Sequence, residues 1–416
     1  MFTFKLKKYF AFTFLLSALL FSAAIARGAA SVFSNDTQAL VREGTKYYEG
    51  SGVKQDYKKA FQLFEQAADR GDAGAQYNLG LMYYEGQGIN QDVHKAFQIW
   101  QKAADKGNKT AQYNLGYMYF EGKFIKQDYQ KAFQLWEKSA NQGFAIAQYN
   151  LALMYDTGKG IKQDYQKSFY WLQQAAQQGL PDAQDNLGRM YLMGQGVKQD
   201  PQKAIYWYEQ AANQGFIHAQ GLLGNIYALA MEGAPQDTQK AIYWLQKAAN
   251  QGEAHSQLSL GRMYYMGKIV KQDYKKAFYW LEKAALQGEA EAQSALGFMY
   301  YEGEGVKKDY QKTIYWWQKA AVQGDAAAQN NLGYLYYSGE VVPQDYQKAL
   351  YWYEKAAAQE ESSDADAVAE SQGDLGVIYY NGLGIKQDKQ KGIFWLKKAA
   401  ERGNKDAEKF LRDRSL

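Results

Sequence analysis

Apolar and polar residues along this chain follow a pattern that recurs about every 36 residues. One unit, residues 75–105, reads AQYNLGLMYYEGQGINQDVHKAFQIWQKAAD, with apolar residues at helical spacing on both sides of a Gly-containing segment. The pattern predicts two amphipathic helices joined as a hairpin.

A recurring Asp marks the start of the second helix in each unit. Eight of the nine intervals between these residues are 36 or 37, and the ninth is 43. A fixed period in this range is typical of a solenoid, in which each unit buries its apolar face against the next. We therefore predict an all-α fold, a right-handed α-solenoid of about ten 36-residue helix-turn-helix repeats over residues 39–405. The markers are Asp56, Asp92, Asp128, Asp164, Asp200, Asp237, Asp273, Asp309, Asp345 and Asp388.

Each hairpin carries residues that begin and end helices. The recurring Asp is expected to N-cap the second helix, and Gly86 and Gly107 suit the C-terminal ends of the first and second helices. The middle of the first helix is Gly in nine units and Ala152 in one, and a Tyr follows three residues later in all ten. Gly within a helix costs about 1 kcal/mol relative to Ala, so its recurrence predicts a close approach by a neighbouring helix. We interpret the Tyr as a residue that packs between units.

Other positions of the first helix vary from unit to unit. They lie three before, one after and five after the central Gly, opposite the nearly constant positions on a helical wheel. Tyr and Arg supply much of the energy in protein contacts, so we predict that these positions form a binding surface. The alternative is that they are ordinary exposed helix residues. The candidate partner-binding residues are Tyr77, Leu81, Tyr113, Tyr117, Tyr149, Asp185, Arg189, Arg262, Phe298 and Tyr334.

An Asn recurs two residues before the central Gly. Its amide could hydrogen-bond an extended peptide backbone or a neighbouring helix, and the recurrence favours the neighbouring helix. The residues are Asn78, Asn114, Asn150, Asn186 and Asn331.

The N-terminal segment differs from the repeats. Lys5, Lys7 and Lys8 precede an apolar run that ends in small residues near position 25. This pattern predicts a cleaved signal peptide over residues 1–26, or cleavage after Ala30, and a short N-terminal segment over residues 27–38. The run is shorter than the roughly 20 residues of a spanning helix, so a membrane anchor is the weaker interpretation. We expect a protein exported to a bacterial periplasm or secreted.

Composition narrows the function classes. The formal net charge of +4 falls to about +1 without the three leader lysines, so we expect no nucleic-acid partner. The chain has no Cys, and its three His residues stand in different repeats, so we predict no disulfide, metal site or cofactor. Ser51 and Lys54 fit an SxxK pattern, but no KTG or SDN accompanies them. We therefore predict that the protein is not an enzyme, with a penicillin-recognising hydrolase as the weakest alternative.

The C-terminal part contains one insertion. Residues 359–370, QEESSDADAVAE, carry five acidic side chains and no basic one. A solvated loop or helix extension is the favoured interpretation, and a hinge or a docking point for a basic partner is the alternative. Residues 406–416 are predicted to form a more polar capping helix, because no following unit covers the end of the array.

The combined pattern AxxxLGxxYxxGxG, then KQDYxKAxxWxxKAAxxG, resembles the Sel-one-like repeat (SLR) family, a relative of the tetratricopeptide repeat, from about Ala39 to Ala407. Ala152, Ala230 and residues 359–370 are the clearest departures. The resemblance implies that the first helices line a concave wall and that the protein is a scaffold or adaptor. We therefore expect an exported scaffold that binds a protein or peptide partner on this face, with a cell-wall or glycan-binding module as the alternative.

Overall fold

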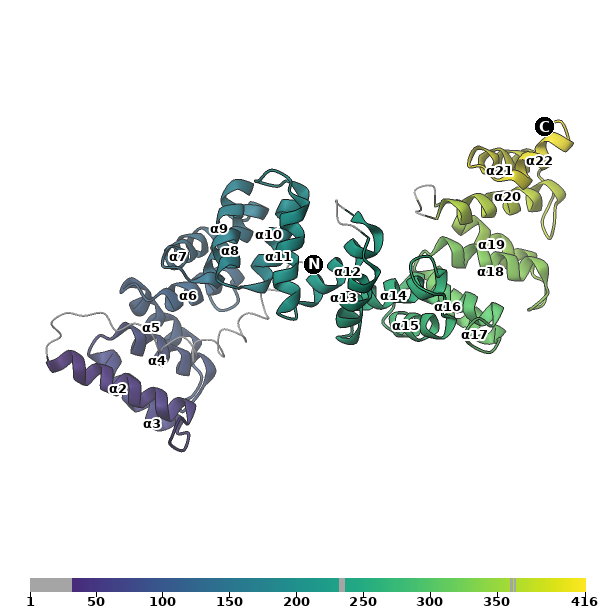
Figure 1. The fold of residues 1–416 in the computed structure, drawn as a ribbon. Helices are drawn as coiled ribbons and strands as arrows, with labels where there is room; N and C mark the ends of the chain where they lie inside the picture. Colours follow the sequence, from purple (N-terminus) through teal and green to yellow (C-terminus); the bar gives the residue numbers. More distant parts are fainter. Residues whose placement is uncertain (1–31, 232–235, 360–361, 363) are drawn as a thin grey trace. The chain divides into compact units, whose positions relative to one another are not determined.

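The computed structural model describes residues 32–231, 236–359, 362 and 364–416. Twenty-one α-helices and no strand occur in these residues, and successive helices run in opposite directions (Figure 1). The all-α prediction is confirmed. The predicted signal peptide lies outside the described residues.

First and second helices alternate along the chain. The first helices are α2(Val32–Glu49), α4(Ala73–Glu85), α6(Lys109–Glu121), α8(Ala145–Thr157), α10(Pro181–Met193), α12(Ile217–Leu229), α14(Ala254–Met266), α16(Ala290–Glu302), α18(Ala326–Ser338) and α20(Ala365–Asn381). The second helices are α3(Tyr57–Asp69), α5(Val93–Asp105), α7(Tyr129–Asn141), α9(Tyr165–Gln177), α11(Pro201–Asn213), α13(Thr238–Asn250), α15(Tyr274–Leu286), α17(Tyr310–Val322), α19(Tyr346–Ala357) and α21(Lys389–Glu401). A last helix, α22(Lys405–Asp413), follows them.

The helices form two compact units, and the boundary falls between Gln163 and Asp164. Helices α2 to α8 belong to the first unit and α9 to α22 to the second. Within each unit, a first helix packs against the second helix that follows it and the second helix that precedes it. Apart from the helices at its two ends, each helix of a unit therefore has a partner on both sides, as expected for stacked hairpins.

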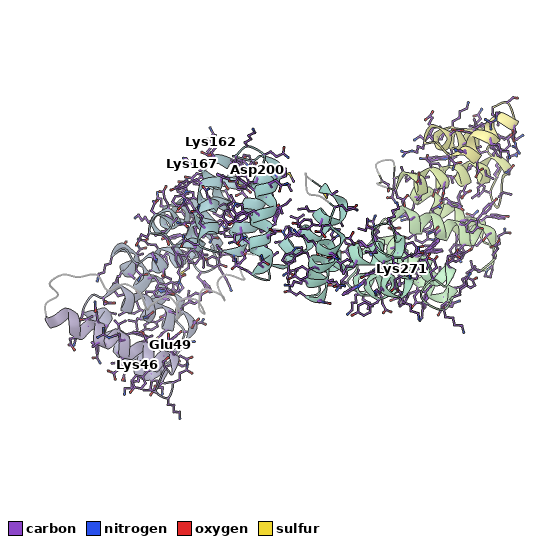
Figure 2. All side chains as sticks on the ribbon, in the orientation of Figure 1. Lys46, Glu49, Lys162, Lys167, Asp200 and Lys271 are labelled. Atoms are coloured by element: carbon purple, nitrogen blue, oxygen red, sulfur yellow. The ribbon has the colours of Figure 1, made fainter. Side chains whose placement is uncertain are left out.

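Capping residues fix where the helices begin and end. The Asp92 carboxylate accepts a hydrogen bond from the backbone N–H of Lys95 at 2.9 Å, and the other nine marker Asp residues cap their helices in the same way. One of them, Asp200 of α11, lies at the surface (Figure 2). The first helix α4 ends at Gly86, whose φ of 74° is left-handed. Ala230 holds this position after α12 with φ 50°, a conformation that a Cβ disfavours.

The central Gly of a first helix lies against a large side chain of the following second helix. A Cβ on Gly80 would lie 2.5 Å from Trp100 Cδ1, and one on Gly297 would lie 2.4 Å from Trp317 Cδ1. Both Trp side chains are buried. The predicted close approach is confirmed, and it is made by a side chain of the second helix of the same hairpin.

The recurring Tyr packs between successive hairpins, as predicted. Tyr119 meets the Phe97 ring of the preceding second helix edge-on, with 5.8 Å between ring centroids. Phe169 and Tyr191 repeat this contact at 5.3 Å. A buried Gln adds a polar link, because Gln112 Nε2 donates to the backbone carbonyl of Ala104 at 3.1 Å. Apolar and polar contacts therefore hold successive hairpins together at the same interface.

The C-terminal helices show what the acidic insertion does. Asp364 N-caps α20, which has 17 residues against 13 in α18, so residues 365–368 extend this helix. Glu370 accepts a hydrogen bond from Asn330 at 3.0 Å. The helix-extension interpretation is confirmed for these residues.

After α21, α22 buries Ala407 and Leu411 against Leu396. Among the described residues, no helix is long and apolar enough to cross a membrane.

Candidate functional site

The predicted binding surface is largely buried in the N-terminal hairpins. The side chain of Tyr113 is 0% exposed, and Asp185 is 5% exposed. Four further candidates are buried as well, namely Tyr77, Leu81, Tyr117 and Tyr149. These six residues were predicted to lie on an open helix face, and that assignment is wrong because they belong to the packing between helices.

Stacked aromatic rings explain the burial of the position three before the central Gly. The ring of Tyr113 lies between Trp136, at a centroid distance of 6.3 Å and an angle of 23°, and Phe144, at 5.4 Å. The Trp136 indole N–H donates to the Tyr113 carbonyl at 3.0 Å. The pair Tyr77 and Trp100 repeats this arrangement at 6.4 Å. Desolvation raises the pKa of Tyr77 to about 12.

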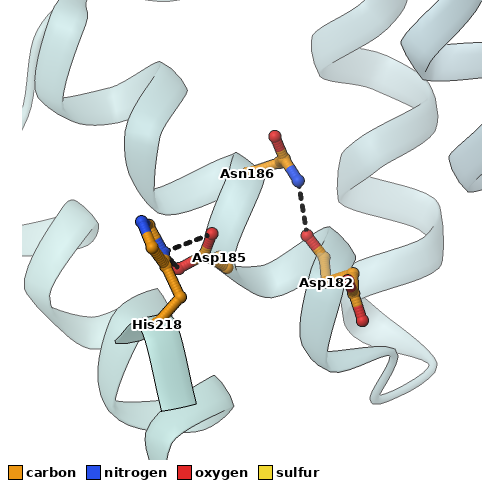
Figure 3. A network of polar contacts seen from close by, with 4 residues as sticks. All are labelled: Asp182, Asp185, Asn186 and His218. Carbon is orange, nitrogen blue, oxygen red and sulfur yellow. Dashed lines mark hydrogen bonds and ion pairs between the residues drawn. The ribbon is translucent and has the colours of Figure 1, made fainter. Parts of the chain in front are cut away.

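The recurring Asn belongs to the same interface. Asn150 Nδ2 lies 3.5 Å from the Tyr113 hydroxyl of the preceding first helix, and both side chains are buried. Asn186 Nδ2 donates within its own helix, to the carbonyl of Asp182 at 2.8 Å (Figure 3). The favoured prediction, a bond to a neighbouring helix, is confirmed for Asn150. At this residue the amide serves the packing of the array.

A polar pair joins α10 to α12. His218 Nδ1 lies 2.8 Å from Asp185 Oδ1 and 3.1 Å from Asp185 Oδ2 (Figure 3). The His218 side chain is 61% exposed, whereas that of Asp185 is 7% exposed. His218 therefore lies at the surface, and the buried carboxylate that it contacts was not predicted from the sequence. The pair ties successive first helices side by side.

The remaining candidates lie in the second unit, and three of them are open. Phe298 is 38% and Tyr334 44% exposed, and the Arg262 side chain is 49% exposed with its guanidinium 2.6 Å from Glu291. Arg189 is half-buried and donates to Gln195 Oε1 at 2.6 Å.

Apolar side chains five residues after the central Gly are exposed on neighbouring first helices. Met193 is 62%, Leu229 68% and Met266 48% exposed. All three occupy a position that the helical wheel places on the varied face, but none of them is among the candidate partner-binding residues. We call six exposed residues of α10 to α18 the first-helix patch: Met193, Leu229, Arg262, Met266, Phe298 and Tyr334.

Comparison with known families identifies the repeat. The Sel1 repeat model matches ten consecutive segments, at residues 38–72, 73–108, 109–144, 145–180, 181–216, 217–253, 254–289, 290–325, 326–360 and 369–404. The chain belongs to the Sel1 repeat family. The predicted resemblance is confirmed, and the break between residues 360 and 369 coincides with the acidic insertion.

Two solved structures of Sel1 type are similar to this chain. One is c5321, described as a protective antigen present in uropathogenic Escherichia coli strains with an SLR fold. It is 34% identical, with a TM-score of 0.81, over 91% of this chain and 81% of that chain. The other is a Sel1 repeat protein from Oxalobacter formigenes, 34% identical with a TM-score of 0.61, over 80% of this chain and 92% of that chain. A comparison with curated proteins gives no match.

The SxxK match of the sequence lies outside the helices. Ser51 lies on the exposed loop after α2, where its hydroxyl donates to Glu49 at 3.1 Å. No group of three or more His, Cys, Asp or Glu residues in the described part of the chain could hold a metal ion. The Sel1 repeat is commonly a scaffold for protein interactions, which its exposed surfaces make.

A second surface of this Sel1 array was missed at the sequence level. Tyr206 and Tyr243, on the second helices α11 and α13, are 52% and 49% exposed and stand directly before a Trp. The YW pair recurs in the sequence, but the predicted binding surface is confined to the first helices. A Tyr that recurs before this Trp, in a helix that packs on both sides, could have predicted the exposed ring.

Proposed function

We propose that this Sel1 repeat protein is an exported, non-catalytic scaffold that binds a protein partner through the first-helix patch of its second unit. The main support for this proposal is that Met193, Leu229 and Met266 are exposed on successive first helices. Phe298 and Tyr334 are exposed on the next two. Soluble proteins rarely leave such neighbouring apolar side chains open without a binding role.

The chemistry of the patch favours a protein segment. Met adapts to irregular apolar partners, whereas Phe, Tyr and Arg are the anchors most often found at protein interfaces. Arg262 stands among these apolar residues and also pairs with Glu291 at 2.6 Å, so it can offer a fixed guanidinium to a carboxylate or carbonyl of the partner. The residue type changes from helix to helix, which suits a partner with a defined sequence.

Capture by the intact mature protein tests the proposal. Wild type is compared with the variant Met266→Ala/Phe298→Ala/Tyr334→Ala on envelope extract, and retained proteins are quantified. We expect the variant to lose a specific protein by about tenfold or more, because interface anchors carry most of the binding free energy. The matched control Gln62→Ala/Gln98→Ala changes exposed second-helix residues and should retain it. Equal retention by the patch variant and wild type would refute the proposal.

The proposed export rests on the pattern of residues 1–26 and is tested separately. Expression of the full chain in a bacterium followed by fractionation should recover a shortened protein outside the cytoplasm, and N-terminal sequencing should begin at Arg27 or, for the second cleavage choice, at Ser31. A full-length protein retained in the cytoplasm would contradict this part of the proposal.

A further inference from the structure

Every second helix of the second unit exposes an aromatic ring at the same position. The ring stands six residues after the capping Asp, and its exposed fraction lies between 49% and 52% in all seven helices. We call these seven residues the aromatic stripe: Tyr170, Tyr206, Tyr243, Tyr279, Tyr315, Tyr351 and Phe394. A half-exposed ring at the same place on α9, α11, α13, α15, α17, α19 and α21 is a regular surface feature.

The hairpin fold does not require these rings. In the first unit, the same position on α3, α5 and α7 holds Gln62, Gln98 and Gln134, all exposed. These helices have the same Asp caps as their counterparts and the same length of 13 residues, apart from α19, which has 12. Gln therefore suffices for folding, and a different requirement must account for the aromatic residue in the second unit.

Each ring is held in a fixed orientation by the next residue. Tyr243 meets Trp244 edge-on at 4.8 Å and 73°, and Tyr315 meets Trp316 at 5.0 Å and 76°. The other five pairs have centroid distances of 4.8 to 5.3 Å. Trp244 is only 6% exposed, so it anchors its neighbour. A ring that is already oriented loses little conformational entropy when a ligand stacks on it.

Lysines accompany the last five rings. The ammonium nitrogen of Lys247 lies 4.7 Å from the Tyr243 ring centroid, and equivalent Lys residues lie 5.0 to 5.3 Å from the rings of α15, α17, α19 and α21. With their capping Asp residues included, these five helices carry thirteen Lys against three Glu and five Asp. Their exposed face therefore combines ring surfaces with a positive potential that attracts anions.

The regularity of the stripe indicates a regular ligand. A partner with a defined sequence would meet varied side chains, as the first-helix patch offers, whereas identical sites at each repeat suit a polymer with a repeating unit. The helices contain no Arg, the residue that dominates base and phosphate recognition, so a nucleic acid fits less well. We propose that the aromatic stripe binds an acidic polysaccharide. Its sugar faces stack on the rings, and its carboxylates pair with the lysines.

Binding of polygalacturonate fragments to the intact protein at low salt tests the proposal. We expect the stripe variant to raise the Kd at least about tenfold while the melting temperature and helical circular dichroism are unchanged, because Gln is the residue that the first unit uses. This variant is Tyr243→Gln/Tyr279→Gln/Tyr315→Gln/Tyr351→Gln. A charge variant should flatten the dependence of affinity on salt, since fewer ion pairs form. It is Lys247→Gln/Lys283→Gln/Lys319→Gln/Lys355→Gln.

The controls separate this proposal from the proposed function. Phe298→Ala/Tyr334→Ala should bind polygalacturonate as wild type does, and the stripe variant should still capture the protein partner. The proposal is overturned by no binding of polygalacturonate, by equal binding of neutral dextran, or by an unchanged Kd in a folded stripe variant. Preferred binding of oligo(dT) or of phosphatidylglycerol vesicles would also overturn it. If the stripe variant melts early, the charge variant decides, and an unchanged salt dependence refutes the proposal.

Discussion

The substitution Gly80→Ala tests how the helices of a hairpin pack, because its local and its tertiary effect on the free energy of unfolding have opposite signs. Ala is favoured over Gly in a helix by about 1 kcal/mol, so local propensity predicts stabilisation. The added Cβ would lie 2.5 Å from Trp100 Cδ1 and 2.6 Å from Trp100 Nε1. Trp100 is 0% exposed and donates to the Tyr77 carbonyl at 3.0 Å, so its ring has nowhere to move.

The clash should outweigh the gain in propensity. Overpacking a well-filled core costs up to about 3 kcal/mol, and subtracting the helix term leaves a net destabilisation of about 2 kcal/mol. Urea unfolding followed by circular dichroism should show a lower midpoint, and hydrogen exchange should be faster in α4 and α5 than in the distant hairpins.

A matched variant distinguishes the clash from a general effect of the substitution. Gly74 lies in the same helix, and the nearest atom to its added Cβ is the Asp72 side-chain oxygen at 3.2 Å. We expect Gly74→Ala to be neutral or stabilising by less than about 1 kcal/mol. In a double-mutant cycle, Gly80→Ala should cost less in the Trp100→Ala background, because the obstructing ring is gone. A Gly80→Ala protein as stable as wild type would refute the reasoning.

Three further predictions concern stability. Tyr113→Ala should lower the free energy of unfolding by about 3 kcal/mol or more, whereas Tyr334→Ala should change it by less than about 0.5 kcal/mol, as urea titration can show. Burial raises the pKa of Asp374 to about 6, so its contribution to stability is full below about pH 4 and is lost as the pH rises through about 6. Asp374→Asn should therefore stabilise the protein at pH 7, by up to about 3 kcal/mol, and flatten the stability profile between pH 4 and 7. Ala230→Gly should raise the melting temperature, because the left-handed conformation costs Ala about 1 kcal/mol more than Gly. Gly194→Ala should lower it for the same reason.

The sequence was sufficient for the repeat and its caps because each signal is local and occurs ten times. Asp92 caps its own helix, and the close approach at Gly80 follows from the cost of Gly in a helix. The outward face of the first helix was harder to predict. A helical wheel places Tyr113 opposite the constant positions, but Trp136 of the same hairpin and Phe144 of the next one cover that side.

The candidate site was therefore only partly predictable. The position three residues before the central Gly is buried, whereas the position one residue after it is buried at Leu81 and Tyr117 but open at Phe298 and Tyr334. Which of them stays open depends on the size of neighbouring side chains, and no single-helix pattern contains that information. The aromatic stripe was missed for another reason. Recurrence alone was taken to mean packing, and only the exposed fractions of Tyr206 and its equivalents show a recurring residue at the surface.

Site-specific photo-crosslinking tests the central claim most directly. A photoreactive phenylalanine analogue is placed at Phe298 or Tyr334 in the first-helix patch and, as a control, at exposed Gln98 of α5. Each protein is irradiated in envelope extract. The account predicts that the same partner band forms from positions 298 and 334, is absent from position 98, and disappears when Met266→Ala is added. Crosslinks of equal strength from all three positions, or from position 98 alone, would contradict it.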